Sequence, residues 1–290
     1  MNMDELQGRV AVITGGASGM GLAFAHRFAA AGMNLVLGDI EVPALDAAVE
    51  GLKGDDVEVL GVRCDVSDAA SVRDLAVAAS ESFGAAHVVC LNAGVATSGP
   101  LHEQTLSDWQ WVLGVNLMGI VHGLDAFLPG LVAQDEGHVV ITASVAGHTA
   151  YPGLGPYSAS KHAAAVIAET LHNELSTSGS RVGATALCPG FVDTGIFESG
   201  RNRPEHLTDA LAEPESDEDR ERRTAFLELI ANEARKPAEV ANLVHDAILT
   251  GTFWVFTDER HLPNIANRHA EIAERRNPTE GRTITEDALG

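Results

Sequence analysis

Short apolar runs and longer amphipathic segments alternate along most of the chain. The apolar runs are rich in β-branched residues and occupy positions 9–14, 34–39, 57–64, 87–91, 138–143, 181–187 and 252–256. Within these runs the apolar residues are consecutive instead of alternating with polar ones. Such runs are typical of strands in a parallel sheet that helices cover on both faces. The pattern predicts a parallel sheet of about seven strands.

The segments between these runs carry the apolar spacing of helices. They occupy positions 21–31, 43–52, 68–83, 107–131, 156–176 and 237–249. Pro43, Pro156 and Pro237 stand near the start of three of them, where a first helical turn tolerates proline. Strands that alternate with helices predict repeated βαβ units, and therefore an α/β fold with a three-layer, doubly wound (Rossmann) sheet. We expect one domain over residues 1–260, because no linker divides the chain.

Two regions depart from this alternation. Between Gly195 and Ile230 the chain is rich in Arg, Pro, Asp and Glu, with six acidic residues among the nine from Glu213 to Glu221. We predict a substrate lid at about 195–230, with a solvated loop as the alternative for its acidic part. Residues 261–290 form a polar C-terminal extension, for which we expect a mobile tail.

Composition excludes several classes of partner. Nineteen Lys and Arg against 41 Asp and Glu give a net charge of −22, which would repel nucleic acids and anionic membranes. No unbroken apolar run approaches the roughly 18 residues of a membrane helix, and the acidic start lacks the features of a secretory signal. We therefore expect a cytoplasmic protein. Cys64, Cys90 and Cys188 lie far apart in apolar runs, which favours buried thiols over a disulfide or a metal site.

A glycine-rich turn follows the first predicted strand. It reads Thr14-Gly15-Gly16-Ala17-Ser18-Gly19-Met20-Gly21 and leads directly into a helix. Glycines in such a turn let the backbone approach a pyrophosphate, which the helix N-terminus then holds. A turn that merely packs a helix on a strand is the alternative, but the position at the first strand-to-helix junction favours a dinucleotide site.

Asp39 ends the second predicted strand and is the candidate for choosing the cofactor. An acidic residue at this place accepts hydrogen bonds from the adenosine ribose hydroxyls and repels the 2′-phosphate of NADP. Neither Ser18 nor Ile40 nor Glu41 supplies a positive charge for that phosphate. The sequence therefore favours NAD over NADP. A strand-end cap is the alternative role for Asp39.

Tyr157 and Lys161 form the most informative pair in the sequence. The chain has two tyrosines and three lysines, so chance would give only about 0.02 Tyr-x-x-x-Lys pairs. On the predicted helix their side chains share a face, and we expect the ammonium to lower the pKa of the phenol toward neutrality for acid–base work. Ser144 closes the fifth predicted strand at the edge where such sheets bind ligands. No GxSxG surrounds Ser18 or Ser144, which argues against a serine hydrolase.

In combination these motifs resemble the short-chain dehydrogenase/reductase family, strongly over residues 7–195 and weakly to about 258. The matching residues are Thr14-Gly15-x-x-x-Gly19-x-Gly21, Asp65-Val66, Asn92-Ala93-Gly94, Asn116, Ser144, Tyr157-x-x-x-Lys161 and Pro189-Gly190. The resemblance implies that Tyr157 exchanges the substrate hydroxyl proton, that Ser144 binds the substrate oxygen, and that Lys161 also holds the nicotinamide ribose. It further implies a water-positioning role for Asn116. The implied cofactor contacts are Gly15, Ser18, Gly19, Met20, Gly21, Asp39, Asp65, Val66, Asn92, Ala93, Gly94, Tyr157, Lys161, Pro189, Gly190, Val192 and Thr194.

These residues predict an NAD-dependent oxidoreductase that interconverts a secondary alcohol and a ketone, with hydride transfer on the nicotinamide face that the resemblance implies is pro-S. A catalytically silent dinucleotide sensor and an epimerase or dehydratase of related type are the alternatives. No metal is expected. We expect an apolar pocket for a cyclic or aryl alcohol if Val145, Tyr151, Phe191, Ile196 and Phe197 face it, although each could equally be core.

The chain also departs from the family pattern at its last predicted strand. Relatives often end this strand with an Asp-Gly-Gly turn, whereas this chain reads Thr257-Asp258-Glu259 and continues to residue 290. The usual tetramer contact at this end is therefore in doubt. We expect a homo-oligomer, either a tetramer or a dimer through the helices at about 107–131 and 156–176, although both helices could be covered internally.

Overall fold

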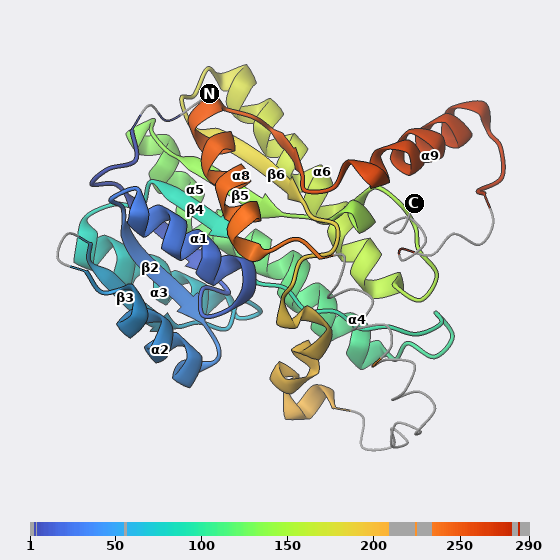
Figure 1. Cartoon of the computed structure of the whole chain (residues 1–290), viewed down its shortest axis with the longest axis horizontal. Helices are drawn as coiled ribbons and strands as arrows, with labels where there is room; N and C mark the ends of the chain where they lie inside the picture. The colour runs from blue at the N-terminus through green and yellow to red at the C-terminus, as the bar shows by residue number, and fades with distance from the viewer. Residues whose placement is uncertain are drawn as a thin grey trace.

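Seven parallel strands form one sheet at the centre of the molecule (Figure 1). The structure is a computed structural model and describes residues 3, 5–54, 57–208, 224, 234–279 and 284. The strands are β1 (Val10–Thr14), β2 (Asn34–Asp39), β3 (Val59–Arg63), β4 (Val88–Leu91), β5 (His138–Thr142), β6 (Gly183–Cys188) and β7 (Trp254–Phe256). Their order in the sheet is β3-β2-β1-β4-β5-β6-β7. Strands β2 and β3 are added on one side of β1 and strands β4 to β7 on the other, so the order of addition switches between β1 and β4, although all strands are parallel. The predicted doubly wound sheet is confirmed.

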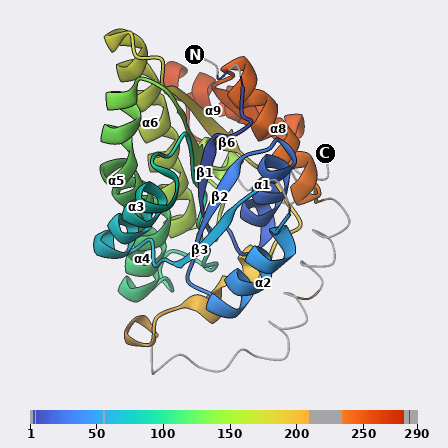
Figure 2. The same ribbon diagram turned by 90° about the vertical axis from the view of Figure 1, so that its left-hand side faces the viewer.

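Helices cover both faces of the sheet, as Figure 2 shows. On one face lie α1 (Gly19–Ala30), α2 (Val42–Leu52) and α8 (Pro237–Thr250), and on the other lie α3 (Ala69–Phe83), α4 (Leu106–Leu113), α5 (Gly119–Gln134) and α6 (Gly155–Ser178). Each face has its own apolar core, with Phe24 and Phe28 in one and Leu75 and Phe127 in the other. Because both faces of the strands are buried, their sequences show continuous apolar runs.

The predicted helix at 107–131 is a longer and interrupted helical stretch. A π-helical turn, η1 (Gly114–Met118), joins α4 to α5. The continuous stretch Leu106–Gln134 is long and apolar enough to cross a membrane. Here it packs as part of a helix layer, since α4 contacts α6 and α5 contacts α3 and β4. In this fold the stretch therefore covers one face of the sheet and is only partly buried.

The predicted lid begins as two short 3₁₀ helices. These are η3 (Gly195–Asn202) and η4 (Glu205–Leu207), and η4 lies against α4. Positions 209–223 and 225–230 of the predicted lid lie outside the described residues. The described part is anchored to the body of the protein at several points, among them Ser199, Arg201 and Arg203.

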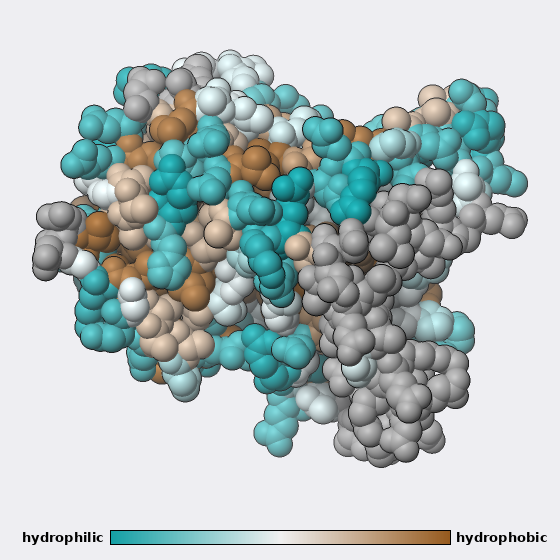
Figure 3. Space-filling view, in the orientation of Figure 1, coloured by the Kyte–Doolittle hydropathy of each residue, from teal (hydrophilic) through white to brown (hydrophobic). Residues whose placement is uncertain are grey.

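The C-terminal extension contains regular structure that the sequence analysis did not predict. A 3₁₀ turn, η5 (Glu259–His261), leads into α9 (Leu262–Glu274), with Pro263 in its first turn. The helix α9 projects from the body in Figure 1, and hydrophilic side chains cover much of it on the face in Figure 3. Its root is fixed because His261 is fully buried and its Nδ1 lies 3.4 Å from the hydroxyl of Tyr151. Residues 262–274 are therefore helical, and the mobility of the C-terminal extension stays a prediction.

Candidate active site

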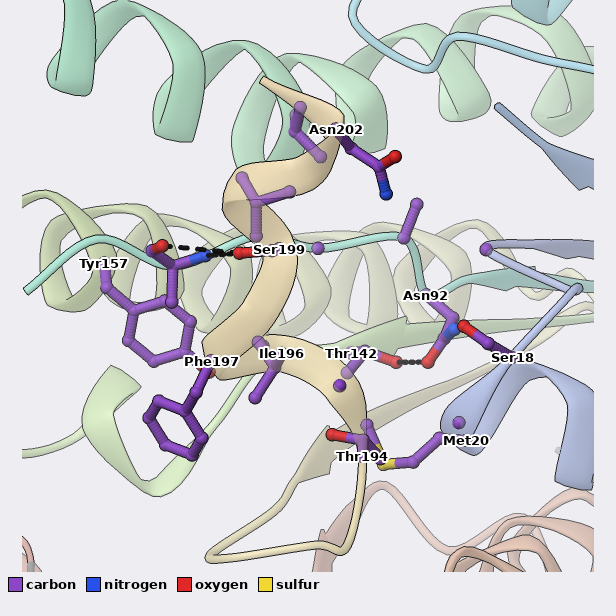
Figure 4. Close-up of a pocket in the computed structure, with 18 of the residues that line it drawn as sticks. Ser18, Met20, Asn92, Thr142, Tyr157, Thr194, Ile196, Phe197, Ser199 and Asn202 are labelled. Carbon is purple, nitrogen blue, oxygen red and sulfur yellow. Dashed lines mark hydrogen bonds between the residues drawn. The ribbon is translucent and has the colours of Figure 1, made fainter. Parts of the chain in front are cut away.

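A cleft lies at the carboxyl ends of the central strands, where doubly wound sheets bind their ligands. Nearly all the predicted site residues line it: Gly15, Ser18, Gly19, Met20, Asp39, Asp65, Val66, Asn92, Ala93, Gly94, Ser144, Tyr157, Lys161, Pro189, Gly190, Val192 and Thr194. In Figure 4 the η3 segment crosses the cleft, with Tyr157 on one side and Ser18 and Met20 on the other. The remaining two, Gly21 and Asn116, lie behind this lining.

The glycine-rich turn has a backbone that side chains would obstruct. Gly15 has a φ of +65°, and a Cβ there would lie 3.0 Å from the Cα of Ala93. A Cβ on Gly21 would lie 2.0 Å from the carbonyl oxygen of Gly15. The turn therefore needs glycine at both places, and it brings the N-terminus of α1 to the cleft floor. This cradle fits the pyrophosphate of a dinucleotide.

Asp39 joins the end of β2 to the glycine-rich turn. Its Oδ2 accepts a hydrogen bond from the backbone N of Ala17 at 2.9 Å, and its Oδ1 accepts one from the backbone N of Glu41 at 3.0 Å. The residue is 9 % exposed and borders the cleft. These bonds orient the carboxylate at the cleft edge while leaving acceptor capacity for a ligand hydroxyl.

Three strand ends are linked to one another beneath the cleft. The hydroxyl of Thr14 accepts a hydrogen bond from the backbone N of Asn92 at 2.9 Å, and Asn92 Nδ2 donates to the carbonyl of Thr14 at 3.1 Å. The hydroxyl of Thr142 donates to Asn92 Oδ1 at 3.2 Å (Figure 4). These contacts fix β1, β4 and β5 relative to one another, so the cleft has a rigid floor.

Ser144, Tyr157 and Lys161 converge at the other end of the cleft. Ser144 follows β5 and caps the 3₁₀ turn η2 (Val145–Gly147), where its Oγ accepts from the backbone N of Ala146 at 3.1 Å. Tyr157 stands in the first turn of α6. Lys161, one turn later, donates from Nζ to the carbonyl of Thr142 at 2.8 Å and lies 5.7 Å from the centre of the Tyr157 ring.

The protein environment shifts the pKa of both helix residues. Burial raises the pKa of Tyr157, and a hydrogen bond with Ser144 lowers it by less. Burial also lowers the pKa of Lys161 to about 8. The predicted lowering of the phenol pKa is therefore wrong for the protein without ligands. The physical reason is that desolvation dominates, while the ammonium donates to the Thr142 carbonyl instead of the phenol.

Asn116 sits in the π-helical turn and is fully buried. Its Oδ1 accepts from the backbone N of Val95 at 2.8 Å, and its Nδ2 donates to the Val95 carbonyl at 2.9 Å and to Ser160 Oγ at 3.0 Å. The side chain thus joins the loop that follows β4 to helix α6. Two residues of α6, Tyr157 and Lys161, line the catalytic end of the cleft. Its predicted role with water stays a prediction.

Buried thiols account for the three cysteines. Cys64, Cys90 and Cys188 are free and buried, as predicted, and burial raises the pKa of all three. None of them is ionised at neutral pH, so they act as small apolar side chains. Among the residues that the structure describes, no group of three His, Cys, Asp or Glu side chains could hold a metal ion.

The substrate end of the cleft is largely apolar. Phe191, Ile196 and Phe197 line it as expected, whereas Val145 and Tyr151 are buried in the core and do not line the cleft. Several further lining residues were not named individually by the sequence analysis: Ser199, Arg201 and Asn202, which lie in the predicted lid, and Trp111, Leu154 and Ile284. No local sequence signal marks Trp111, Leu154 or Ile284, since tertiary folding alone brings them to the cleft.

The η3 segment is tied down on both sides of the cleft. Ser199 Oγ accepts from the backbone N of Ala96 at 3.1 Å. Arg203 pairs with Asp108 on α4, and its guanidinium lies 5.5 Å from the ring centre of Trp111. Arg201 pairs with Glu41 beyond the end of β2. The segment therefore bridges the nucleotide side and the substrate side.

Comparison with known proteins agrees with this geometry. The family model of short chain dehydrogenase matches residues 9–205. A CLA biosynthesis dehydrogenase/reductase of Lactiplantibacillus plantarum is 30% identical over 93% of this chain and 95% of that protein. A 1-deoxy-11-beta-hydroxypentalenate dehydrogenase of Streptomyces exfoliatus is 39% identical over 67% of this chain and 71% of its own length.

A solved structure is similar over nearly the whole chain. It is a short chain dehydrogenase/reductase from Burkholderia phymatum in complex with NAD, 42% identical, with a TM-score of 0.91 over 97% of this chain and 100% of that one. This likeness includes the seven-stranded sheet and its flanking helices. The chain therefore belongs to the short-chain dehydrogenase/reductase family of oxidoreductases.

Proposed function

We propose that this protein is an NAD-dependent dehydrogenase that interconverts a secondary alcohol and a ketone. The observation that carries the proposal is one continuous cleft with the glycine-rich turn and Asp39 at one end and Ser144, Tyr157 and Lys161 at the other. A nicotinamide cofactor, when bound, accepts or delivers the hydride. The protein has to bind that cofactor, orient the substrate and move one proton.

Tyr157 is the residue that exchanges this proton. Its phenol borders the cleft, and its raised pKa keeps the proton in place until a substrate oxygen needs it. Ser144 Oγ donates a hydrogen bond to the same substrate oxygen, and so stabilises charge that develops there. The Lys161 ammonium beside the Tyr157 ring favours the phenolate that forms when the proton leaves.

Three features support NAD and an apolar substrate. Asp39 presents a carboxylate at the nucleotide end, where it would repel a 2′-phosphate. The solved relative from Burkholderia phymatum contains NAD. At the catalytic end, Trp111, Phe191 and Phe197 supply aromatic surface for a cyclic or aryl alcohol.

An absorbance screen tests this proposal. Purified protein is mixed with NAD⁺ and a panel of cyclic, aromatic and steroid alcohols, and formation of NADH is followed. We expect NADH from at least one alcohol class with the wild type and none above background with Tyr157→Phe. Tight NAD⁺ binding by calorimetry without reduction by any alcohol would contradict the proposal and favour a dinucleotide sensor.

A further inference from the structure

Glu41 and Arg201 meet at the nucleotide end of the cleft, although 160 residues separate them. Arg201 donates from Nε at 3.1 Å and from a terminal guanidinium nitrogen at 2.7 Å to the same Glu41 oxygen. Asn202 Nδ2 donates to that oxygen at 2.7 Å. Hydrogen bonds from these two partners lower the pKa of Glu41, so its carboxyl is ionised at neutral pH.

This bridge lies next to the residue expected to choose the cofactor. The backbone N of Glu41 donates to Asp39 Oδ1, and the side chains of Asp39, Glu41 and Arg201 all line the cleft. The sequence analysis found no positive charge near Asp39. The fold supplies one, because η3 carries Arg201 across the cleft.

Arg201 is also held by its own segment. Its other terminal nitrogen donates to the carbonyls of Gly195 at 3.2 Å and Glu198 at 3.0 Å. These two bonds do not involve Glu41, so the guanidinium stays near its place when the Glu41 charge is removed. A guanidinium fixed in this way is well suited to bind a phosphate group.

We propose that Glu41 is a second determinant of cofactor choice, because it neutralises and occupies an arginine that could otherwise bind the 2′-phosphate of NADP. This inference rests on the proposed function, in which Asp39 meets the adenosine ribose. Asp39 repels the 2′-phosphate of NADP. Glu41 pairs with Arg201 and so prevents its guanidinium from attracting that phosphate. Two carboxylates and one paired guanidinium leave this corner negative.

The test is calorimetric binding of NAD⁺ and NADP⁺ to four proteins: the wild type, Glu41→Gln, Arg201→Gln and the double variant. Glu41→Gln keeps the side-chain size and removes its charge. We expect its affinity for NADP⁺, relative to NAD⁺, to rise by roughly tenfold or more, the effect of one charge-assisted contact. In the double variant this gain should disappear.

A matched control is Glu198→Gln, which removes a negative charge from the exposed side of the same segment. It should leave the affinity ratio unchanged. The gain in Glu41→Gln should also shrink as salt concentration rises, because exposed charges are screened. An unchanged ratio in Glu41→Gln, or an equal gain in the double variant, would overturn the inference.

The design separates this inference from the proposed function. A wild type that binds NADP⁺ more tightly than NAD⁺ would contradict the proposed NAD preference. The dependence of the Glu41→Gln effect on Arg201 is measured by the same four proteins whichever cofactor the wild type prefers. If the Glu41→Gln effect does not depend on Arg201, only the proposed role of Glu41 is contradicted, and the proposed function is not.

Discussion

Burial shifts the pKa values of individual polar side chains in this protein. The Lys161 side chain is 3 % exposed, and its pKa of about 8 leaves it largely protonated at neutral pH. The ammonium donates to one backbone carbonyl and is buried, so its field at the neighbouring phenol is weakly screened by water. The reactive pair therefore depends on desolvation as well as on its spacing along the helix.

Tyr157→Phe tests the proton-exchange role most directly. The change removes the hydroxyl and keeps the ring, so we expect kcat to fall by at least about 10²- to 10⁴-fold, the usual contribution of a positioned acid or base. Calorimetric affinity for NAD⁺ should stay close to that of the wild type. Near-normal turnover would show that another group exchanges the proton.

His138 makes stability depend on pH. It is fully buried at the start of β5, with Nε2 2.8 Å from Thr185 Oγ1, whose proton goes to the Thr252 carbonyl. His138 Nε2 therefore donates, and among the described residues Nδ1 has no hydrogen-bond partner. Burial lowers the pKa of His138 to about 3. Between pH 6.5 and 3 the unfolded chain binds this proton and the folded protein does not, so stability falls as pH falls.

His138→Gln should reduce that dependence. We expect the slope of unfolding free energy against pH, between pH 6 and pH 4, to fall by up to about 1.4 kcal/mol per pH unit. Denaturant unfolding at several pH values measures the slope. His102→Gln is the control, because the His102 side chain is 80% exposed and should not change the slope. Equal slopes for wild type and His138→Gln would contradict the buried neutral histidine.

At the scale of elements, η3 and η4 connect parts of the site that the sheet does not connect. Arg203 fixes them to α4 through Asp108 and the face of Trp111, and both charged side chains are mostly buried, at 18% and 14% exposure. The same Asp108 completes the capping box of α4 with Thr105. The start of the predicted lid is thus anchored to α4. The Arg203 contacts that anchor it lie beside the substrate end of the cleft, which Trp111 lines.

Arg203→Met should loosen this anchor. The variant keeps an apolar side chain over Trp111 and loses the ion pair, so we expect local opening to become easier by about 1.4 kcal/mol and amide exchange over 195–208 about tenfold faster. Hydrogen exchange with mass spectrometry measures it. Lys236→Met, which breaks the exposed Lys236–Asp193 pair, is the matched control and should change little. Unchanged exchange in Arg203→Met would mean that other contacts hold the segment.

At the scale of the whole molecule, apolar side chains remain exposed on the helix layer formed by α4 to α6. Met118 is 41% exposed, Val121 38%, Val132 45% and Val166 61%. We propose that a second copy of the chain covers this face, as the sequence analysis expected for the helices at 107–131 and 156–176. Such association would remove apolar surface from water despite the high net charge.

Val166→Glu should weaken that association. A carboxylate in an apolar contact between copies is costly to desolvate, so we expect the mass measured by light scattering to shift toward the monomer. Leu243→Glu on α8, which covers the opposite face of the sheet, adds the same charge at a leucine that is 37% exposed and should leave the mass unchanged. A wild type that is itself monomeric would contradict the proposed oligomer.

Much of this protein is determined by short-range sequence patterns. Continuous apolar runs give the strands because both faces of a parallel sheet are buried, and glycines at 15 and 21 mark the turn because no side chain fits there. Tyr157 and Lys161 were recognisable because one helical turn places them together. In each case the physical requirement is satisfied within a few residues, so it leaves a local trace.

Tertiary structure decided the features that depend on distant neighbours. Arg201 reaches Glu41 because η3 crosses the cleft, and Ile284, far along the chain, lies with Phe191 and Phe197 at the substrate end. Val145 and Tyr151 belong to the core, although their apolar character suited a pocket equally well. The pKa of Tyr157 is raised because desolvation, which depends on all surrounding atoms, outweighs the hydrogen bond with Ser144. Local sequence encodes backbone geometry and spacing, whereas burial and long-range contacts are properties of the folded chain.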